Sequence, residues 1–363
     1  MKILLTGATG YIAQRLLPVL LEGDHEVVCC SRDKYRFNKE SFASEKLTVI
    51  EVDFLKKETL TEIPADIDAA YYLIHSMSST TGDFTTLEAT AAQNFIEGIS
   101  HTKAQQIIYL SGIVNEKQLS KHLRSRQNVE TILASGKVPL TTLKAGIIVG
   151  SGSASFEIIR DLVEKLPVMI APRWLSTACQ PIAIRNVIEF LSGVLLRSDT
   201  FHHSYDIGGP DILSYKQMLL QFAEVRGLKR RIVVVPVMTP KLSSYWLYFV
   251  TSTSYTLARN LVASMKVEVV CTPNNLTELL GIQLIPYKKA IAMAFDKIEQ
   301  NEVVSSWKDA LTSNILNRGI AQHIEVPVNG CFKDVRKVEV RNVDDVVARI
   351  WAIGGSTGWY YGN

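Results

Sequence analysis

The chain has 363 residues, which at about 150 residues per domain indicates about two domains. Apolar residues make up 47% of the sequence and charged residues 21%, and this composition excludes a disordered polar chain. Thirty-nine Lys and Arg residues against 36 Asp and Glu residues give a net charge of +3. This overall balance points neither to nucleic acid nor to an anionic membrane as a partner.

The N-terminus and the cysteines indicate the cellular compartment. Residues 1–7 lack a long apolar core and a small-residue cleavage site, so we expect no signal peptide. No apolar run approaches the ~18–20 residues that span a bilayer, so we expect no membrane span. Cys29 and Cys30 are adjacent in an apolar run, and side chains of neighbouring strand residues point to opposite faces, so both are interpreted as small buried hydrophobes. We therefore expect a cytoplasmic protein.

Short apolar runs alternate with helical patterns over residues 1–150. The expected strands are residues 3–6, 26–30, 47–52, 69–74, 106–110 and 141–148. The expected helices are residues 12–21, residues 84–100 and one that ends near residue 134. Continuous apolar strands separated by helices predict an α/β fold with a doubly wound parallel sheet of the Rossmann type.

The pattern changes twice further along the chain. Residues 151–304 predict a smaller α+β part at the carboxyl edge of the sheet, on the substrate side. Its expected strands are residues 205–207 and 232–235. Its expected helices are residues 156–165, 215–225, 276–280 and 288–299, with Ser155 as the N-cap of the first of them. Residues 305–363 are interpreted as the beginning of a third, truncated α+β domain, with a strand at residues 337–341.

A glycine-containing loop follows the first expected strand. Its sequence places Gly7 at the tight turn, Gly10 where the backbone must approach a pyrophosphate, and small Ala13 where the helix packs on the strand. The unpaired amides of the following helix face the same phosphates. The candidate cofactor-binding residues here are Gly7, Thr9, Gly10, Tyr11 and Ile12. A tight strand-to-helix turn without a ligand is the alternative.

Two further positions bear on the choice of cofactor. Arg32 and Asp33 follow the second strand, where an acidic residue would hold the ribose hydroxyls of NAD and an arginine would favour the 2′-phosphate of NADP. Because Arg32 comes first, we expect NADP, with NAD as the alternative. Asp53 and Phe54 follow the third strand and would border the adenine, although an Asp at this place also forms simple turns.

Read together, these residues resemble the atypical and extended short-chain dehydrogenase/reductase families. The likeness is to bacterial NAD(P)-binding proteins labelled nucleoside-diphosphate-sugar epimerases and to NmrA-like proteins, and it covers about residues 1–300. The segments that carry it are residues 6–13, 71–77, 122–126, 150–156, 180–183 and 206–210. The tail through residues 354–361 resembles the opening of a helix-grip (SRPBCC-like) domain. The resemblance implies a Rossmann fold, a nicotinamide dinucleotide, and contact of Ile74, His75 and Ser76 with that cofactor, although His75 also fits an ordinary strand end.

The same resemblance points to the place of the chemistry. Typical members carry Tyr-x-x-x-Lys on the helix after the fifth strand, with a serine upstream. At the matching positions this chain has His122, Arg126 and Ser111, so the spacing is kept while the tyrosine and the lysine are replaced. His122 would then exchange a proton, Arg126 would orient the ribose and Ser111 would polarise a carbonyl. The alternative is that catalysis has been lost and the helix presents a solvated basic face.

These features favour an NADPH-dependent oxidoreductase that acts on an unknown small carbonyl or quinone compound. The alternatives are a non-catalytic dinucleotide-binding sensor or scaffold and a nucleotide-sugar epimerase-like isomerase. We expect no metal site, because the histidines, including His202 and His203, show no metal-ligand spacing with cysteines or acids. We expect no nucleic-acid partner, and a homodimer stays open as an assembly.

Overall fold

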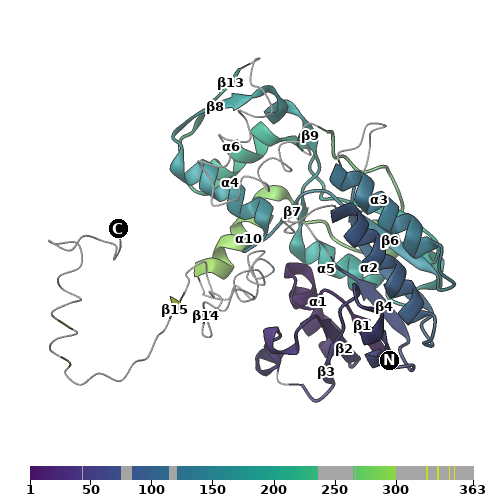
Figure 1. The fold of residues 1–363 in the computed structure, drawn as a ribbon. Coiled ribbons are helices and arrows are strands. Elements are labelled where there is room, and N and C mark those ends of the chain that lie inside the picture. The colour runs from purple at the N-terminus through teal and green to yellow at the C-terminus, as the bar shows by residue number, and fades with distance from the viewer. Residues whose placement is uncertain are drawn as a thin grey trace. The chain divides into compact units, whose positions relative to one another are not determined.

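A seven-stranded parallel sheet runs through the first part of the chain (Figure 1). Its strands are β1 (Lys2–Leu5), β2 (Glu26–Ser31), β3 (Leu47–Glu51), β4 (Ala69–Tyr72), β5 (Gln106–Gly112), β6 (Leu140–Ala145) and β11 (Ser204–Ile207). Their spatial order is β11-β6-β5-β4-β1-β2-β3, and each pairing within this sheet is parallel. The doubly wound fold expected from the sequence is confirmed. The order reverses between β1 and β4, which is where ligands bind in such sheets.

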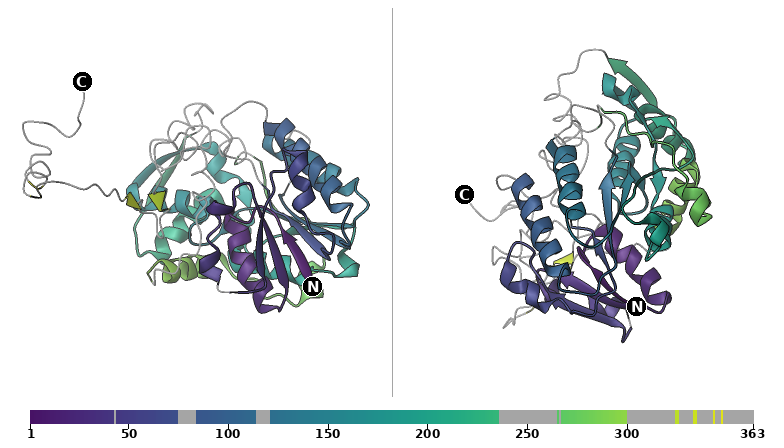
Figure 2. Two further views of the ribbon diagram at one scale, coloured as in Figure 1. Left: turned by 60° about the horizontal axis from the view of Figure 1, so that its bottom comes forward. Right: turned by 90° about the vertical axis from the view of Figure 1, so that its right-hand side faces the viewer.

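Helices cover both faces of this sheet (Figure 2). On one face, α1 (Tyr11–Glu22) and α5 (Ile184–Gly193) contribute four buried leucines, Val187 and Phe190 to a core that includes Cys29. On the other face, α2 (Phe84–Ile99) and α3 (Lys121–Ala134) pack over a second core that includes Cys30. The two adjacent cysteines are thus buried on opposite faces, as the alternation of strand side chains predicts.

The remaining elements build a smaller α+β part with its own core. Its helices are α4 (Ala154–Lys165), α6 (Tyr215–Val225) and α10 (Tyr287–Glu299), whereas α9 (Leu276–Leu280) contributes Leu276 to the core beside α1 and α5. Its strands pair as β7 (Ile148–Val149) with β10 (Ile182–Ala183), β8 (Val168–Pro172) with β13 (Arg231–Val235), and β9 (Ala178–Cys179) with β12 (Leu213–Ser214). The rings of Phe156, Phe222 and Phe295 meet in its core with centroids 5.3–5.6 Å apart.

Three expectations from the sequence are corrected here. The expected strand at residues 141–148 is interrupted at Gly146, after which β7 leaves the large sheet to pair with β10. The strand at residues 205–207, expected in the smaller part, is β11 at the edge of the large sheet. The N-cap of α4 is Ser153, whose hydroxyl accepts a hydrogen bond from the backbone N–H of Phe156 at 3.2 Å, and not Ser155.

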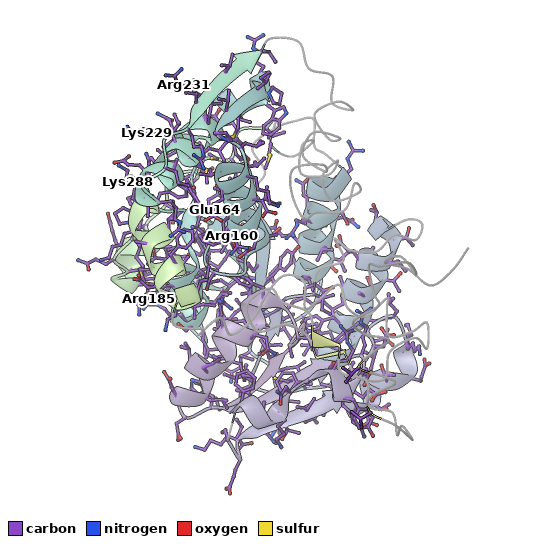
Figure 3. All side chains as sticks on the ribbon, turned by 90° about the vertical axis from the view of Figure 1, so that its left-hand side faces the viewer. Arg160, Glu164, Arg185, Lys229, Arg231 and Lys288 are labelled. Atoms are coloured by element: carbon purple, nitrogen blue, oxygen red, sulfur yellow. The ribbon has the colours of Figure 1, made fainter. Side chains whose placement is uncertain are left out.

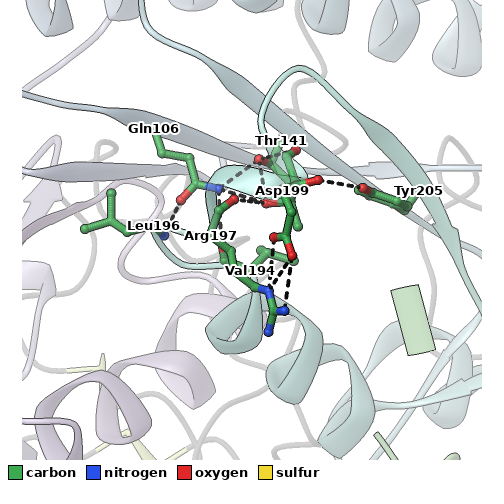
Figure 4. A network of polar contacts seen from close by, with 8 residues as sticks. Gln106, Thr141, Val194, Leu196, Arg197, Asp199 and Tyr205 are labelled. Atoms are coloured by element: carbon green, nitrogen blue, oxygen red, sulfur yellow. Dashed lines mark hydrogen bonds and ion pairs between the residues drawn. The ribbon is translucent and has the colours of Figure 1, made fainter. Parts of the chain in front are cut away.

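A buried polar network ties β5 and β6 to the segment after α5 (Figure 4). The Gln106 amide nitrogen donates to Thr141 Oγ1 at 2.8 Å and to the carbonyl of Val194 at 2.9 Å, and its oxygen accepts from the backbone N–H of Leu196. Thr141 Oγ1 in turn donates to the carbonyl of Thr200 at 2.9 Å. Gln106 is the first residue of β5 and Thr141 the second residue of β6, so the network lies at the amino-terminal edge of the sheet.

The computed structural model describes residues 1–42, 44–74, 84–113, 121–235, 265, 267–299, 324–325, 333–334, 343 and 347. The chain divides into two compact units, Met1–Ser313 and Asn314–Asn363. In the second unit the structure describes β14 (Ile324–Glu325) paired antiparallel with β15 (Lys333–Asp334). The expected strand at residues 337–341 lies outside the described residues. None of the helices in the described ranges combines the length and apolar character that crossing a bilayer requires.

Candidate functional site

The turn between β1 and α1 is pressed against the end of β4. Gly7 has a φ of +63°, and a Cβ added there would lie 2.5 Å from the carbonyl oxygen of Leu73. Thr6 fixes the same contact, because its hydroxyl donates to the carbonyl of Tyr71 at 2.9 Å and accepts from the N–H of Leu73 at 3.1 Å. Glycine is therefore required at position 7 both by its backbone angle and by the close approach of β4. The turn lies at the point where the strand order reverses.

The first turn of α1 is suited to a bound anion. Its N-cap is Gly10, which offers no side-chain cap, and the first turn contains no acidic residue. The Gly10 N–H donates to the carbonyl of Gly7 at 2.8 Å, which sets the tight entry into the helix. The initial amides of a helix lack intrahelical partners and carry the positive end of the helix dipole. These groups fit a dinucleotide pyrophosphate. Thr9 and Ile12, both half-buried, flank this turn.

Tyr11 connects α1 to the loop that precedes α4. The Arg15 guanidinium lies over the Tyr11 ring at 4.2 Å and donates to the carbonyl of Ser151 at 2.7 Å. Burial raises the pKa of Tyr11 to about 12, against the opposing effect of the Arg15 charge. A Cβ at Gly150 would lie 2.7 Å from the Tyr11 hydroxyl. The side chain of Tyr11 is thus directed toward residues 150–153, while its backbone stays in the first turn of α1.

Two guanidinium groups lie near the end of β2. Arg32 is exposed, and four residues later Arg36 is half-buried; burial and then the nearby positive charge of Arg32 lower the pKa of Arg36. Asp33 accepts a hydrogen bond from the N–H of Tyr35 at 2.9 Å and so caps the short 3₁₀ helix Lys34–Arg36. The carboxylate that would bind the ribose of NAD is therefore engaged locally. Arg36 was missed from the sequence, although its four-residue spacing from Arg32 was a usable signal.

The residues expected at the adenine and along the cofactor lie partly in a turn and partly against the core. Asp53 accepts from the N–H of Leu55 at 3.1 Å, as a turn-forming Asp does. The Phe54 side chain is buried against Phe95, with ring centroids 5.6 Å apart, so it belongs to the core. Ile74 is half-buried just beyond β4 and packs against the same core. His75 and Ser76 lie outside the described residues.

Ser111 and Arg126 approach the same tyrosine. Ser111 is buried near the end of β5, and Arg126 is half-buried on α3. The hydroxyl of Tyr109 donates to the carbonyl of Arg126 at 3.5 Å. Burial raises the pKa of Tyr109, while the Arg126 charge and a hydrogen bond with Ser111 act in the opposite direction. His122 lies on α3 four residues before Arg126, which places both residues on one face of the helix, but its side chain is outside the described part of the chain.

Further polar pairs surround this group and were not singled out from the sequence. Lys144 pairs in register with Ser111 on the neighbouring strand, and its ammonium contacts Glu130 of α3 at 3.0 Å. The Ser125 hydroxyl donates to the buried carboxylate of Glu88, which joins α3 to α2. Only the spacing of Arg126 and Glu130 is visible in the sequence. The other contacts depend on which strands and helices become neighbours.

The fold and the phosphate-binding turn define a dinucleotide-binding protein of the Rossmann type. Residues 7–145 match the family model described as NAD(P)H-binding. This part of the chain is thus similar to NAD(P)H-binding domains, which agrees with the sequence resemblance to the atypical short-chain dehydrogenases/reductases. No curated protein matched the chain.

Solved structures of the same fold come from both reductases and epimerases. Triphenylmethane reductase from Citrobacter sp., complexed with NADP(H), has a TM-score of 0.65 at 17% identity, covering 81% of this chain and 100% of that chain. A nucleoside-diphosphate-sugar epimerase from Staphylococcus aureus has a TM-score of 0.64 at 14% identity, covering 80% and 99%. UDP-glucuronic acid 4-epimerase from Bacillus cereus, in complex with UDP-glucuronic acid and NAD, has a TM-score of 0.60 at 16% identity, covering 83% and 99%. At these identities the likeness establishes the fold.

Proposed function

We propose that this chain is an NADPH-dependent oxidoreductase that reduces a small carbonyl or quinone compound. The observation that carries the proposal is the approach of Ser111 and Arg126 to the hydroxyl of Tyr109, on the strand next to β4. This position adjoins the reversal of strand order, where the phosphate-binding turn lies. The reductase of the same fold that binds NADP(H) supports the same class of reaction.

The preference for NADPH rests on the residues after β2. Arg32 and Arg36 present two positive charges near each other, while Asp33 is engaged as a helix cap. A 2′-phosphate would offset the repulsion between the guanidinium groups, whereas the 2′-hydroxyl of NADH would not. This arrangement also supports Arg36 as a cofactor-binding residue in addition to Arg32.

Titration of the purified protein with NADPH and NADH tests this preference. Arg32→Gln should weaken NADPH binding about ten-fold or more, since a hydrogen bond to a charged group contributes about 1.5–3 kcal/mol. NADH binding should change little. Lys34→Gln is the matched control, because Lys34 is an exposed cation between the two arginines. Equal losses for both cofactors would show that Arg32 does not contact the 2′-position.

The chemistry is divided among three side chains of the chain. When bound, the nicotinamide supplies a hydride to the carbonyl carbon of the substrate. Ser111 donates a hydrogen bond to the carbonyl oxygen, His122 gives that oxygen its proton, and Arg126 orients the nicotinamide ribose. A histidine titrates near neutral pH, so it can replace the usual tyrosine as the proton donor.

A panel of carbonyl and quinone compounds with NADPH tests the activity. His122→Ala should lower kcat by about 10²–10⁴-fold, the usual contribution of general acid catalysis, with little change in NADPH affinity. Lys121→Ala is the control on the preceding residue of α3. A protein that binds NADPH but turns over no compound would favour the alternative of a nucleotide-binding sensor or scaffold, which the missing Tyr-x-x-x-Lys already suggests.

The third candidate is a nucleotide-sugar epimerase, which the epimerases of the same fold support. Such enzymes need the cofactor in its oxidised form at the start of each turnover. Tightly bound NAD that stays with the protein through purification, together with conversion of a nucleotide-sugar, would favour this function over the reductase.

A further inference from the structure

The paired strands β8 and β13 have one buried face and one exposed face. Their register sets Val168 beside Arg231 and Ile170 beside Val233, so these four side chains share a face. Val168, Ile170 and Val233 are 57%, 57% and 54% exposed, and we call these three residues the apolar face. The opposite face is buried in the core of the smaller part through Met169, Ala171 and Ile232.

An exposed face of this kind is unusual for parallel strands, which are normally covered on both sides. The two strands lie at the end of their unit farthest from β2 and β3 (Figure 1). Aliphatic side chains that remain more than half exposed on a strand pair mark an interaction surface when they adjoin one another.

Positive charge surrounds the apolar face. Arg231 lies on the same face of β13, exposed Lys229 precedes it by two residues, and exposed Arg173 directly follows β8. Figure 3 shows Arg231 and Lys229 at the same end of the unit. Within the described ranges these three cations form no ion pair. A groove of about 620 Å³, lined by residues that include Val168, Lys229 and Arg231, opens beside the apolar face.

The acidic residues near the groove are already neutralised. Glu224, which lines it, contacts the Lys288 ammonium at 2.7 Å. Glu164 of α4 contacts the Arg226 guanidinium at 3.3 Å. The net charge of the surface beside the apolar face is therefore positive, although the chain as a whole carries only +3. The balanced composition concealed this local excess.

We infer that the apolar face and its flanking cations dock the protein on an anionic lipid surface. Aliphatic side chains at the boundary between headgroups and acyl chains, with Lys and Arg facing lipid phosphates, form the usual combination of peripheral membrane binding. This docking involves residues other than those assigned to the cofactor, so it does not depend on the proposed reaction.

A second copy of the chain fits this surface poorly. A stable interface buries about 800 Å² on each partner, which three aliphatic side chains on two strands do not supply. A two-fold contact centred on the apolar face would also bring Arg231 of one copy close to the same residue of its partner. Anionic lipid removes both difficulties, because it is extended and carries the opposite charge.

Sedimentation with lipid vesicles tests the inference. The full chain should sediment with vesicles of phosphatidylcholine mixed with phosphatidylglycerol, and much less with phosphatidylcholine alone. The double variant Lys229→Gln/Arg231→Gln should lower the partition coefficient about five-fold for each charge removed. The triple variant Val168→Thr/Ile170→Thr/Val233→Thr, which keeps β-branched residues in both strands, should also lose binding.

Matched variants separate this surface from general effects of charge and hydrophobicity. Lys103→Gln/Lys137→Gln removes two exposed cations that precede β5 and β6, and Ile212→Thr removes an aliphatic side chain that is 58% exposed. These controls should bind vesicles as the wild type does, and unchanged thermal midpoints should accompany the losses in the test variants. Absence of wild-type binding, or full binding by the test variants, overturns the inference. If the wild type self-associates and the same substitutions abolish this self-association, the inference is overturned in favour of a second copy of the chain.

Discussion

Replacement of Gln106 by alanine should destabilise the fold without affecting the cofactor site. The substitution removes four hydrogen bonds in the buried network at the start of β5, of which the one to Thr200 Oγ1 is long at 3.5 Å. Thr141 Oγ1 keeps its bond to the carbonyl of Thr200, but the carbonyl of Val194 and the N–H of Leu196 lose the Gln106 amide. Leu196 has a φ of +52°, so this contact also holds a residue in the left-handed region.

The size of the effect follows from these lost partners. A buried polar group left without a hydrogen bond costs about 1–3 kcal/mol, and the truncation also creates a small cavity, so we expect a loss of about 3–5 kcal/mol in the free energy of unfolding. At about 2.1 cal/mol/K of unfolding entropy per residue, the thermal midpoint of the unit Met1–Ser313 should fall by about 5–8 °C.

Urea unfolding of the wild type and two variants measures this loss. Gln105→Ala is the matched control, because Gln105 is the preceding residue and its side chain is exposed, so it should change the stability by less than about 0.5 kcal/mol. NADPH affinity of Gln106→Ala should equal that of the wild type, since the network lies at the amino-terminal edge and the phosphate-binding turn at the carboxyl edge. A loss below about 1 kcal/mol would refute the reasoning, because it would mean that water replaces the amide at little cost.

Three further substitutions test local features. Gly7→Ala places a Cβ 2.5 Å from a backbone oxygen and should weaken NADPH binding at least ten-fold. It should also lower the free energy of unfolding by more than the control Gly227→Ala, which has a similar positive φ but open space around it and should cost about 1 kcal/mol. Equal effects of the two substitutions would contradict the role of the close approach. Tyr11→Phe should change how the free energy of unfolding depends on alkaline pH. The pKa of Tyr11 is about 12 in the folded protein and about 10 in the unfolded chain, so burial of the neutral phenol contributes stability below pH 10 that is lost as the pH rises through 12. Urea unfolding should therefore show the variant gaining up to about 2–3 kcal/mol on the wild type across that range, and parallel pH curves would contradict this. Ser214→Ala removes the capping box of α6 and should cost about 1 kcal/mol in urea unfolding. The control Lys216→Ala, at a half-buried position in the first turn of the same helix, should change the stability little. Equal effects of the two substitutions would show that the cap is dispensable.

The local pattern of the sequence was sufficient for most of the large sheet. Apolar runs of strand length and the turn at Gly7 predicted β1 to β5, their connecting helices and the phosphate-binding turn. The helix at residues 215–225 was also expected with the bounds that α6 has. These features depend on hydrophobic periodicity and on backbone angles, which a single segment determines by itself.

Features that depend on distant partners were not predicted correctly. The run at residues 205–207 is a strand by its pattern, but nothing local shows that it pairs with β6 of the large sheet. Ser153 and Ser155 both fit a helix N-cap, and the choice depends on where β7 ends. In the candidate site, the contact of Tyr109 with Arg126 requires α3 to pack over β5, which spacing along the chain does not reveal.

The place of β11 has a practical consequence for dividing the molecule. A shortened clone that stops near residue 150 would contain β6 but not the strand that covers its outer side. The exposed edge of β6 would then offer unpaired amides and carbonyls to other chains, and such edges promote aggregation. An isolated nucleotide-binding fragment of this protein should therefore be designed to extend beyond Ile207.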